Sequence, residues 1–235
     1  MADFAQFESI IGRAFRDKSL LEQAFTHRSY LNENRLPPQA GGPPREHNER
    51  LEFLGDAVLE LAVTEFLYGK YPEKPEGELT AFRAALVNTV SISDAAQKLG
   101  MNDYLLLSRG ESRDTGRARQ IILANAFEAL IGAIYLDAGY EGAKEFIASQ
   151  LFHKTDDVVE NRLWQDAKSR LQEVVQEKLR LTPAYQLLDQ SGPDHDRTFV
   201  VGVYLGNEKA ATGEGRSKQE AEQSAAEKAL QAKGC

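Results

Sequence analysis

The hydrophobic pattern of the chain changes its period once, and this change constrains the fold more than any other feature. Up to about residue 154, apolar residues recur at three- and four-residue spacing, the repeat of an α-helix with one buried face. The segments with this spacing are residues 20–25, 51–67, 80–99 and 121–136. The pattern therefore predicts an all-α first domain.

The last third of the sequence predicts a second, smaller domain. A helix is expected over residues 167–179, strands over 184–190, 198–205 and 209–213, and a final helix from Ser217. Glu220 lies three residues after Ser217, which is the spacing of a capping box and marks a helix start. The predicted order is α-β-β-β-α, that of a small α+β domain.

The boundaries follow from the polar segment between these two patterns. Asp156, Asp157 and Glu160 surround little that could form a core. We therefore expect domains at residues 3–154 and 166–234, joined by a linker at 155–165. A chain of 235 residues is long enough for two domains with cores of their own.

Charge and cysteine content limit the partners and the compartment. The formal net charge is −8, but residues 165–235 carry 10 basic and 11 acidic residues, so the excess acid lies in the first two thirds. The only cysteine is Cys235, which excludes an intramolecular disulfide. The N-terminus is unlike a signal peptide, and polar residues interrupt the longest apolar stretch. We expect a cytoplasmic protein with no membrane segment.

Three acids form one stripe along the predicted helix at 51–67 and the two residues just before it. Glu49, Glu52 and Asp56 stand at i, i+3 and i+7, so all three project from one side. The opposite side carries apolar residues that are expected to anchor the helix in a core, namely Leu51, Leu54, Val58 and Leu61. Acids at this spacing repel one another unless a cation compensates. The stripe is either an ordinary polar face or part of a metal site.

A second helical run contains two isolated polar side chains. Asn125 and Glu128 are the only strongly polar residues in 121–136. A buried carboxylate is costly unless it is paired or bound to metal, so Glu128 either pairs with a buried Arg or backbone donors, or faces the first stripe and shares a divalent cation. Oxygen ligands suit Mg²⁺. A di-iron bundle requires Glu-x-x-His, whereas Ile131 follows Glu128 at that spacing. We expect structural roles for His27 and His47.

These residues carry a resemblance to a known family. Residues 47–58, His-Asn-Glu-Arg-Leu-Glu-Phe-Leu-Gly-Asp-Ala-Val, closely resemble the signature helix of the ribonuclease III family. Residues 26–30, 76–80 and 122–137 are similar to its other blocks, in the family's order. The C-terminal third resembles a double-stranded-RNA-binding domain. The resemblance implies a helical endonuclease domain followed by an RNA-binding domain.

The resemblance also implies an activity and a site. It implies Mg²⁺-dependent hydrolysis of phosphodiesters in double-stranded RNA by a homodimer, with Mn²⁺ as a substitute cation and no organic cofactor. The products would carry 5′-phosphate and 3′-hydroxyl ends, and the substrates would be ribosomal RNA precursors and other structured RNAs. By family position, the catalytic residues are Asp56 and Glu128. The metal ligands are Glu52, Asp56, Asn125 and Glu128, and the accessory acids are Glu49 and Glu76. Phe53 matches the aromatic residue that inserts into the partner subunit.

One position departs from the family. Asn125 stands where the family most often has Asp. An amide keeps one neutral oxygen ligand but removes a negative charge, so Mg²⁺ should bind more weakly. The alternative function is therefore a catalytically weakened regulator that binds double-stranded RNA.

The resemblance further implies which residues of the second domain contact RNA. A-form RNA is recognised mostly by shape, through its minor groove and its phosphates. The expected contacts are Gln172 and Gln176 on the first helix, Pro193 and His195 in the loop between the first two strands, and Arg216, Ser217 and Lys218 at the start of the last helix. A helix N-terminus favours an anion such as phosphate.

Overall fold

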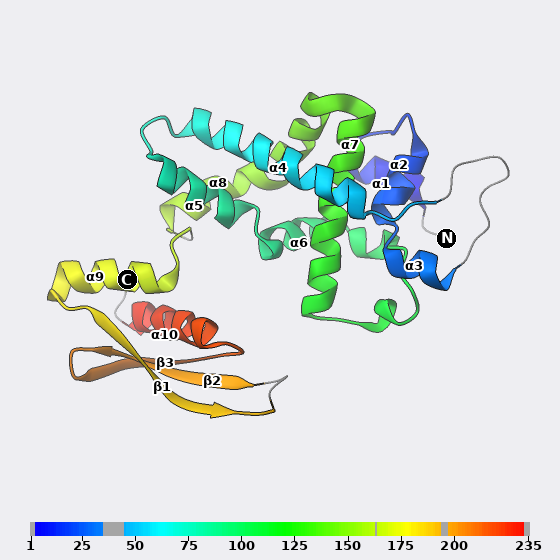
Figure 1. Cartoon of the computed structure of the whole chain (residues 1–235). Coiled ribbons are helices and arrows are strands. Elements are labelled where there is room, and N and C mark those ends of the chain that lie inside the picture. Colours follow the sequence, from blue (N-terminus) through cyan, green and yellow to red (C-terminus); the bar gives the residue numbers. More distant parts are fainter. Residues whose placement is uncertain (1–2, 35–44, 163, 194–196, 233–235) are drawn as a thin grey trace. The chain divides into compact units, whose positions relative to one another are not determined.

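A computed structural model describes residues 3–34, 45–162, 164–193 and 197–232. The chain divides into two compact units, Met1–Trp164 and Gln165–Cys235. The first unit is helical throughout, and the second contains a helix, three antiparallel strands and a helix (Figure 1). The predicted fold class is confirmed.

The helices of the first unit follow the predicted apolar spacing. They are α1 (Phe4–Ile11), α2 (Lys18–Phe25), α3 (Arg28–Glu33), α4 (Glu49–Lys70), α5 (Glu76–Leu86), α6 (Thr89–Lys98), α7 (Arg117–Leu151) and α8 (Thr155–Glu160), with short 3₁₀ turns at Met101–Tyr104, Glu111–Arg113 and Phe152–Lys154. Side-chain caps fix several starts: Asp17 accepts from the amide of Ser19 (2.9 Å) and Asn88 from that of Ser91 (2.9 Å).

Helix α7 forms the centre of this unit. Most of its residues between Ile122 and Ile134 are buried against the other helices. A left-handed Gly139 (φ 75°) interrupts the helix and divides it in two. By length and composition alone, the stretch Arg117–Glu160 includes a window apolar enough to cross a membrane, but 61% of that window is buried inside the protein. Its apolar character is that of a core helix.

Helices α4 and α7 cross with their backbones in contact. A Cβ atom built on Gly55 would lie 1.7 Å from the carbonyl oxygen of Glu128, and one on Gly132 would lie 2.2 Å from the carbonyl oxygen of Leu51. No side chain fits at either position, so two glycines are needed here. This crossing brings the acidic stripe of α4 against the polar pair of α7.

The segment after α7 differs from the prediction. Residues 155–160, expected to begin the linker, form α8, whose Thr155 and Val158 are buried in the first unit. Trp164 also packs against that unit's core, edge-on to Phe82 (ring centroids 5.1 Å apart). Two buried residues among six hold this short helix on the surface of the first unit, although its sequence is mostly polar.

The second unit is an antiparallel sheet covered by two helices. Its elements are α9 (Ala167–Leu179), β1 (Pro183–Ser191), β2 (Thr198–Leu205), β3 (Glu208–Gly215) and α10 (Lys218–Ala232), with the strands in the order β1-β2-β3. A Cβ on Gly213 would lie 2.1 Å from the backbone nitrogen of Ala225. The alanine-rich face of α10 therefore lies directly on the backbone of β3.

Candidate active site

The glycine crossing gathers four of the predicted residues. Glu52 and Asp56 flank Gly55 on α4, and Glu128 is the residue whose carbonyl group Gly55 contacts on α7. Asn125 lies about one turn before Glu128. Glu52, Asn125 and Glu128 are half-buried and Asp56 is exposed, so the group is open to solvent on one side.

The charges of these carboxylates act on one another. The pKa of Glu128 is raised to about 7, first by burial and then by the negative charges of Asp56, Glu52 and Glu60. Burial, Glu49 and Asp56 likewise raise the pKa of Glu52, and a hydrogen bond from Asn125 partly offsets this rise. The Asn125 amide donates this bond, which leaves its oxygen available as an acceptor. Half-buried like charges of this kind are typical of functional sites.

The donor set suits a hard divalent cation. It consists of three carboxylates and one amide oxygen, the ligand type that Mg²⁺ and Ca²⁺ prefer. Within the described part of the chain, no three His, Cys, Asp or Glu side chains converge closely enough to hold a metal ion as they stand. The backbone contact at Gly55 is what keeps Glu52 and Asp56 of α4 beside Glu128 of α7.

The two accessory acids lie in different surroundings. Glu49, at the start of α4, is within 3.5 Å of Arg28 and adds to the charge acting on Glu52. Glu76, at the start of α5, accepts a hydrogen bond from Thr80 (2.9 Å) and lines a hollow between α4 and α5 with Tyr68. Glu76 is not among the groups that act on Glu128 or Glu52 in the described residues. The structure therefore groups Glu49, but not Glu76, with the central acids.

One residue of this environment was missed by the sequence analysis. Glu60 stands one turn after Asp56, so it extends the acidic stripe, and its charge acts on Glu128. Its carboxylate pairs with Arg83 of α5, with 2.7 Å between Oε2 and Nε. Its spacing of four residues from Asp56 could have indicated from the sequence that Glu60 belongs to the stripe.

His27 has the structural role expected of it. Its Nδ1 atom accepts from the backbone amide of Ser29 (3.3 Å) and so caps α3. Burial lowers its pKa, which keeps the ring neutral and able to accept this bond. His47 lies 3.9 Å from Glu49, at the edge of the acidic group.

Phe53 belongs to an apolar surface rather than to the core. It is 82% exposed, and Tyr68 (75%) is also exposed on α4. Leu61 was expected in the core, but it is 56% exposed, so that prediction was wrong. Spacings of eight and seven residues place the three on one side of the helix. A large apolar stripe on a helix commonly marks an interaction site.

The predicted RNA contacts of the second unit are on its surface. Gln172 and Gln176 are exposed on α9, and Pro193 is exposed after β1. His195 lies outside the described residues. Arg216, Ser217 and Lys218 are exposed where α10 begins.

The predicted cap at this helix start is present, with its return bond made one residue earlier than in a standard capping box. The hydroxyl of Ser217 accepts from the amide of Glu220 (3.1 Å), and the carboxylate of Glu220 accepts from the amide of Arg216 (2.9 Å). The cap fixes where α10 begins, and it therefore fixes the position of the basic residues beside that start.

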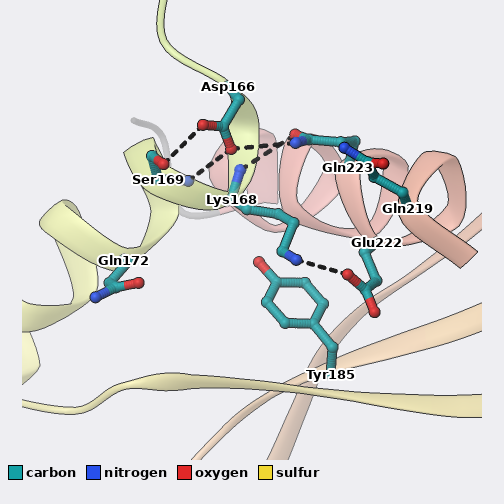
Figure 2. Close-up of a pocket in the computed structure, with 8 residues that line it drawn as sticks. All are labelled: Asp166, Lys168, Ser169, Gln172, Tyr185, Gln219, Glu222 and Gln223. Atoms are coloured by element: carbon teal, nitrogen blue, oxygen red, sulfur yellow. Dashed lines mark hydrogen bonds and ion pairs between the residues drawn. The ribbon is translucent and has the colours of Figure 1, made fainter. Parts of the chain in front are cut away.

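A polar network holds α9 and α10 together beside these residues (Figure 2). Asp166 accepts from Ser169 at the start of α9 and from the amide of Gln223 on α10 (3.1 Å). Lys168 pairs with Glu222 (2.6 Å). The hollow between the two helices is lined by Asp166, Lys168, Ser169, Gln172, Tyr185, Gln219, Glu222 and Gln223. The network thus fixes the spacing between the predicted contacts on α9 and those at the start of α10.

Comparisons with known proteins agree with both units. Residues 17–155 match the family described as Ribonuclease-III-like, and residues 167–233 match the double-stranded RNA binding motif. The chain is 47% identical to Ribonuclease 3 of Bacillus licheniformis over 227 residues, covering 97% of this chain and 88% of that protein. It is 47% identical to Ribonuclease 3 of Enterococcus faecalis over 93% of this chain and 92% of that protein.

A solved structure is similar to the first unit. The nuclease domain of ribonuclease III from Campylobacter jejuni is 39% identical, with a TM-score of 0.54, over 63% of this chain and 98% of that domain. A helical unit with clustered acids, followed by an RNA-binding unit, defines the class of endoribonucleases that cleave double-stranded RNA. The chain belongs to the ribonuclease III family.

Proposed function

We propose that this endoribonuclease uses Mg²⁺, held at the α4–α7 crossing, to hydrolyse double-stranded RNA. The observation that carries this proposal is the backbone contact at Gly55, which brings Glu52 and Asp56 against Glu128. A divalent cation held by Glu52, Asp56, Asn125 and Glu128 would polarise the scissile phosphate and would activate water for attack on it. Mn²⁺, with a similar preference for oxygen, is expected to substitute.

Each residue of the group has a distinct task in this proposal. Asp56 is exposed and faces incoming RNA, whereas Glu128 is half-buried and gains most from a cation, because burial and neighbouring acids disfavour its charge. Asn125 orients Glu52 through its amide group and offers its oxygen as a neutral ligand. Glu49 supplies further negative charge at the edge, beside Arg28.

We assign the selection of double-stranded substrates to the second unit. In this proposal, Gln172 and Gln176, which are exposed on α9, meet a minor groove. The residues at the start of α10 that meet phosphates are Arg216, Ser217 and Lys218. Pro193 and His195 are proposed to meet a second minor groove. Products with 5′-phosphate and 3′-hydroxyl ends, and ribosomal RNA precursors among the substrates, are part of the same proposal, as is a cytoplasmic location.

We propose that the active form is a homodimer joined through the exposed side of α4. Phe53, Leu61 and Tyr68 expose apolar surface there, and Tyr68 also lines the hollow beside Glu76. The Campylobacter jejuni nuclease domain is itself described as having a region involved in dimer formation. In such a dimer, the hollow between α4 and α5 is the surface that receives Phe53 of the partner subunit.

The alternative of a weakened RNA-binding regulator is not favoured, because the relatives at 47% identity are ribonucleases and the acids Glu52, Asp56 and Glu128 are together. The test separates cutting from binding. Glu128→Ala should abolish Mg²⁺-dependent cleavage of an RNA duplex while its affinity for the duplex stays within about twofold. Glu141→Ala, an exposed acid on the same helix, is the matched control and should keep both. Equal loss of binding and cutting in Glu128→Ala would contradict the proposal.

A further inference from the structure

The last residues of the first unit fold back onto its surface. Phe152 stacks on Phe66, with ring centroids 3.8 Å apart and an interplanar angle of 11°. Val158 of α8 is buried in the core, and Trp164 packs edge-on to Phe82 of α5. Helices α8 and α5 lie side by side (Figure 1). The chain's only tryptophan is therefore the final packing contact of the unit.

Two features of this segment are unfavourable only while it is packed. The hydroxyl of Thr155 is buried and has no hydrogen-bond partner among the described residues. Arg162 adopts a left-handed backbone conformation (φ 51°), which disfavours a residue with a side chain. Both penalties disappear when the segment leaves the surface, because water hydrates the hydroxyl and the backbone relaxes.

The polar contacts that hold the segment are weak. Asp156 pairs with Lys70 and accepts from the hydroxyl of Tyr71 (3.3 Å), but its carboxylate is well exposed. Ion pairs at exposed positions contribute little to stability. Packing of Val158 and Trp164 is thus the main interaction opposing release.

The second unit begins directly after this segment. Gln165 donates to Glu173 of α9 (3.2 Å), and Asp166 caps α9. From Trp164 to Asp166 the chain can extend only about 7 Å, whereas from Lys154, the last residue before α8, to Asp166 it can extend about 40 Å. Packing of α8 and Trp164 therefore decides how long the connection between the two units is.

We propose that α8 together with Trp164, the strap, undocks from the first unit as a local unfolding event and so lengthens the connection to the RNA-binding unit. The docked strap keeps the two units on a short connection. The undocked strap lets the second unit stay on RNA while the first unit moves along it. This inference goes beyond the cleavage chemistry and does not depend on the proposed metal site.

The test measures hydrogen exchange of α8 amides in the full chain, with tryptophan fluorescence as a second readout. Amides of α8 should exchange at least about tenfold faster than those of α5 and α7, as expected of a unit that opens locally. Trp164 emission should change in urea before the helical signal is lost. Exchange of α8 only together with the whole unit, or a single shared urea transition, would overturn the proposal.

Variants of the strap separate this proposal from simple fraying. Thr155→Val removes the unpaired hydroxyl and should slow α8 exchange by about tenfold. Arg162→Gly removes the backbone strain and should slow it by about fivefold. Trp164→Ala should accelerate it, and Trp164→Phe should restore most of the protection. If Thr155→Val and Arg162→Gly both leave the hydrogen-exchange rates of α8 unchanged, these two penalties do not favour undocking and the proposal is wrong.

A separate experiment tests whether RNA binding promotes undocking of the strap. A perfect RNA duplex added to the Glu128→Gln chain, which is expected to bind without cutting, should accelerate α8 exchange and leave α5 protected. Unchanged or slower exchange of α8 in the complex would refute the coupling. Because the urea and exchange measurements need no RNA and no metal, their failure is distinguishable from a failure of the proposed cleavage chemistry.

Discussion

Adding one methyl group at the helix crossing should dismantle the active site. In Gly55→Ala, the new Cβ would lie 1.7 Å from the carbonyl oxygen of Glu128 and 2.8 Å from the backbone nitrogen of Gly132. Ordinary carbon contacts are about 3.5 Å, so α4 and α7 must separate locally by about 1.5–2 Å. Overpacking of this kind costs about 1–3 kcal/mol of unfolding free energy.

The effect on catalysis should exceed the effect on stability. A displacement of about 1 Å in a catalytic constellation can reduce rates about 10²-fold, and here Glu52 and Asp56 move relative to Glu128. Single-turnover cleavage of an RNA duplex, measured below the unfolding transition, reports this loss.

A second glycine of the same helix provides the control. Gly69 has nothing within 4 Å of its Cβ position, so Gly69→Ala should cut normally and gain up to about 1 kcal/mol. A Gly55→Ala protein that cuts within about twofold of the parent would refute the claim that the crossing positions the site.

The remaining predictions concern the pH dependence, self-association and RNA affinity. The pKa of Glu128 in the metal-free protein is about 7, above its ordinary 4.5, so the folded state binds the extra proton and stability falls as pH rises between these values. In EDTA at pH 8, the free energy of unfolding of Glu128→Gln should therefore be on the order of 3 kcal/mol higher than that of the parent. This difference should vanish below pH 4.5. Unfolding free energies that depend on pH in the same way in both proteins would contradict the prediction. Phe53→Asp should shift the sedimentation equilibrium toward monomer, and an unchanged dimer would exclude the exposed side of α4 as the interface. Arg216→Ala and Lys218→Ala should each weaken duplex binding and reduce the slope of log affinity against log salt by about one, as measured by filter binding at several salt concentrations.

The sequence predicted the two units because hydrophobic period depends on local geometry alone. Apolar spacing over 51–67 and 121–136 corresponds to α4 and α7, and the predicted strand segments after residue 184 correspond to the sheet. Helix α8 could not be predicted in this way, since six residues are too few for a period. Its two buried residues, Thr155 and Val158, contact partners distant in sequence.

The sequence indicated which residues form the site, but not how the fold arranges them. The i, i+3, i+7 spacing placed Glu52 and Asp56 on one face, and the apolar surroundings singled out Glu128. Glu76 lies apart because α5 carries it to a different surface, which no spacing within one helix can indicate. Likewise, only the fold shows that Gly55 is required for close approach rather than for flexibility.

A denaturing gel of a perfect RNA duplex, incubated with the protein with and without Mg²⁺ beside Asn125→Asp and Glu128→Ala, tests the role of these acids most directly. We expect the parent to cut only with Mg²⁺ and Glu128→Ala not to cut. Asn125→Asp should cut at lower Mg²⁺ concentration, because a fourth charge joins the group. Cleavage by Glu128→Ala, or an intact duplex with the parent, would contradict the claim that this group of acids carries the reaction.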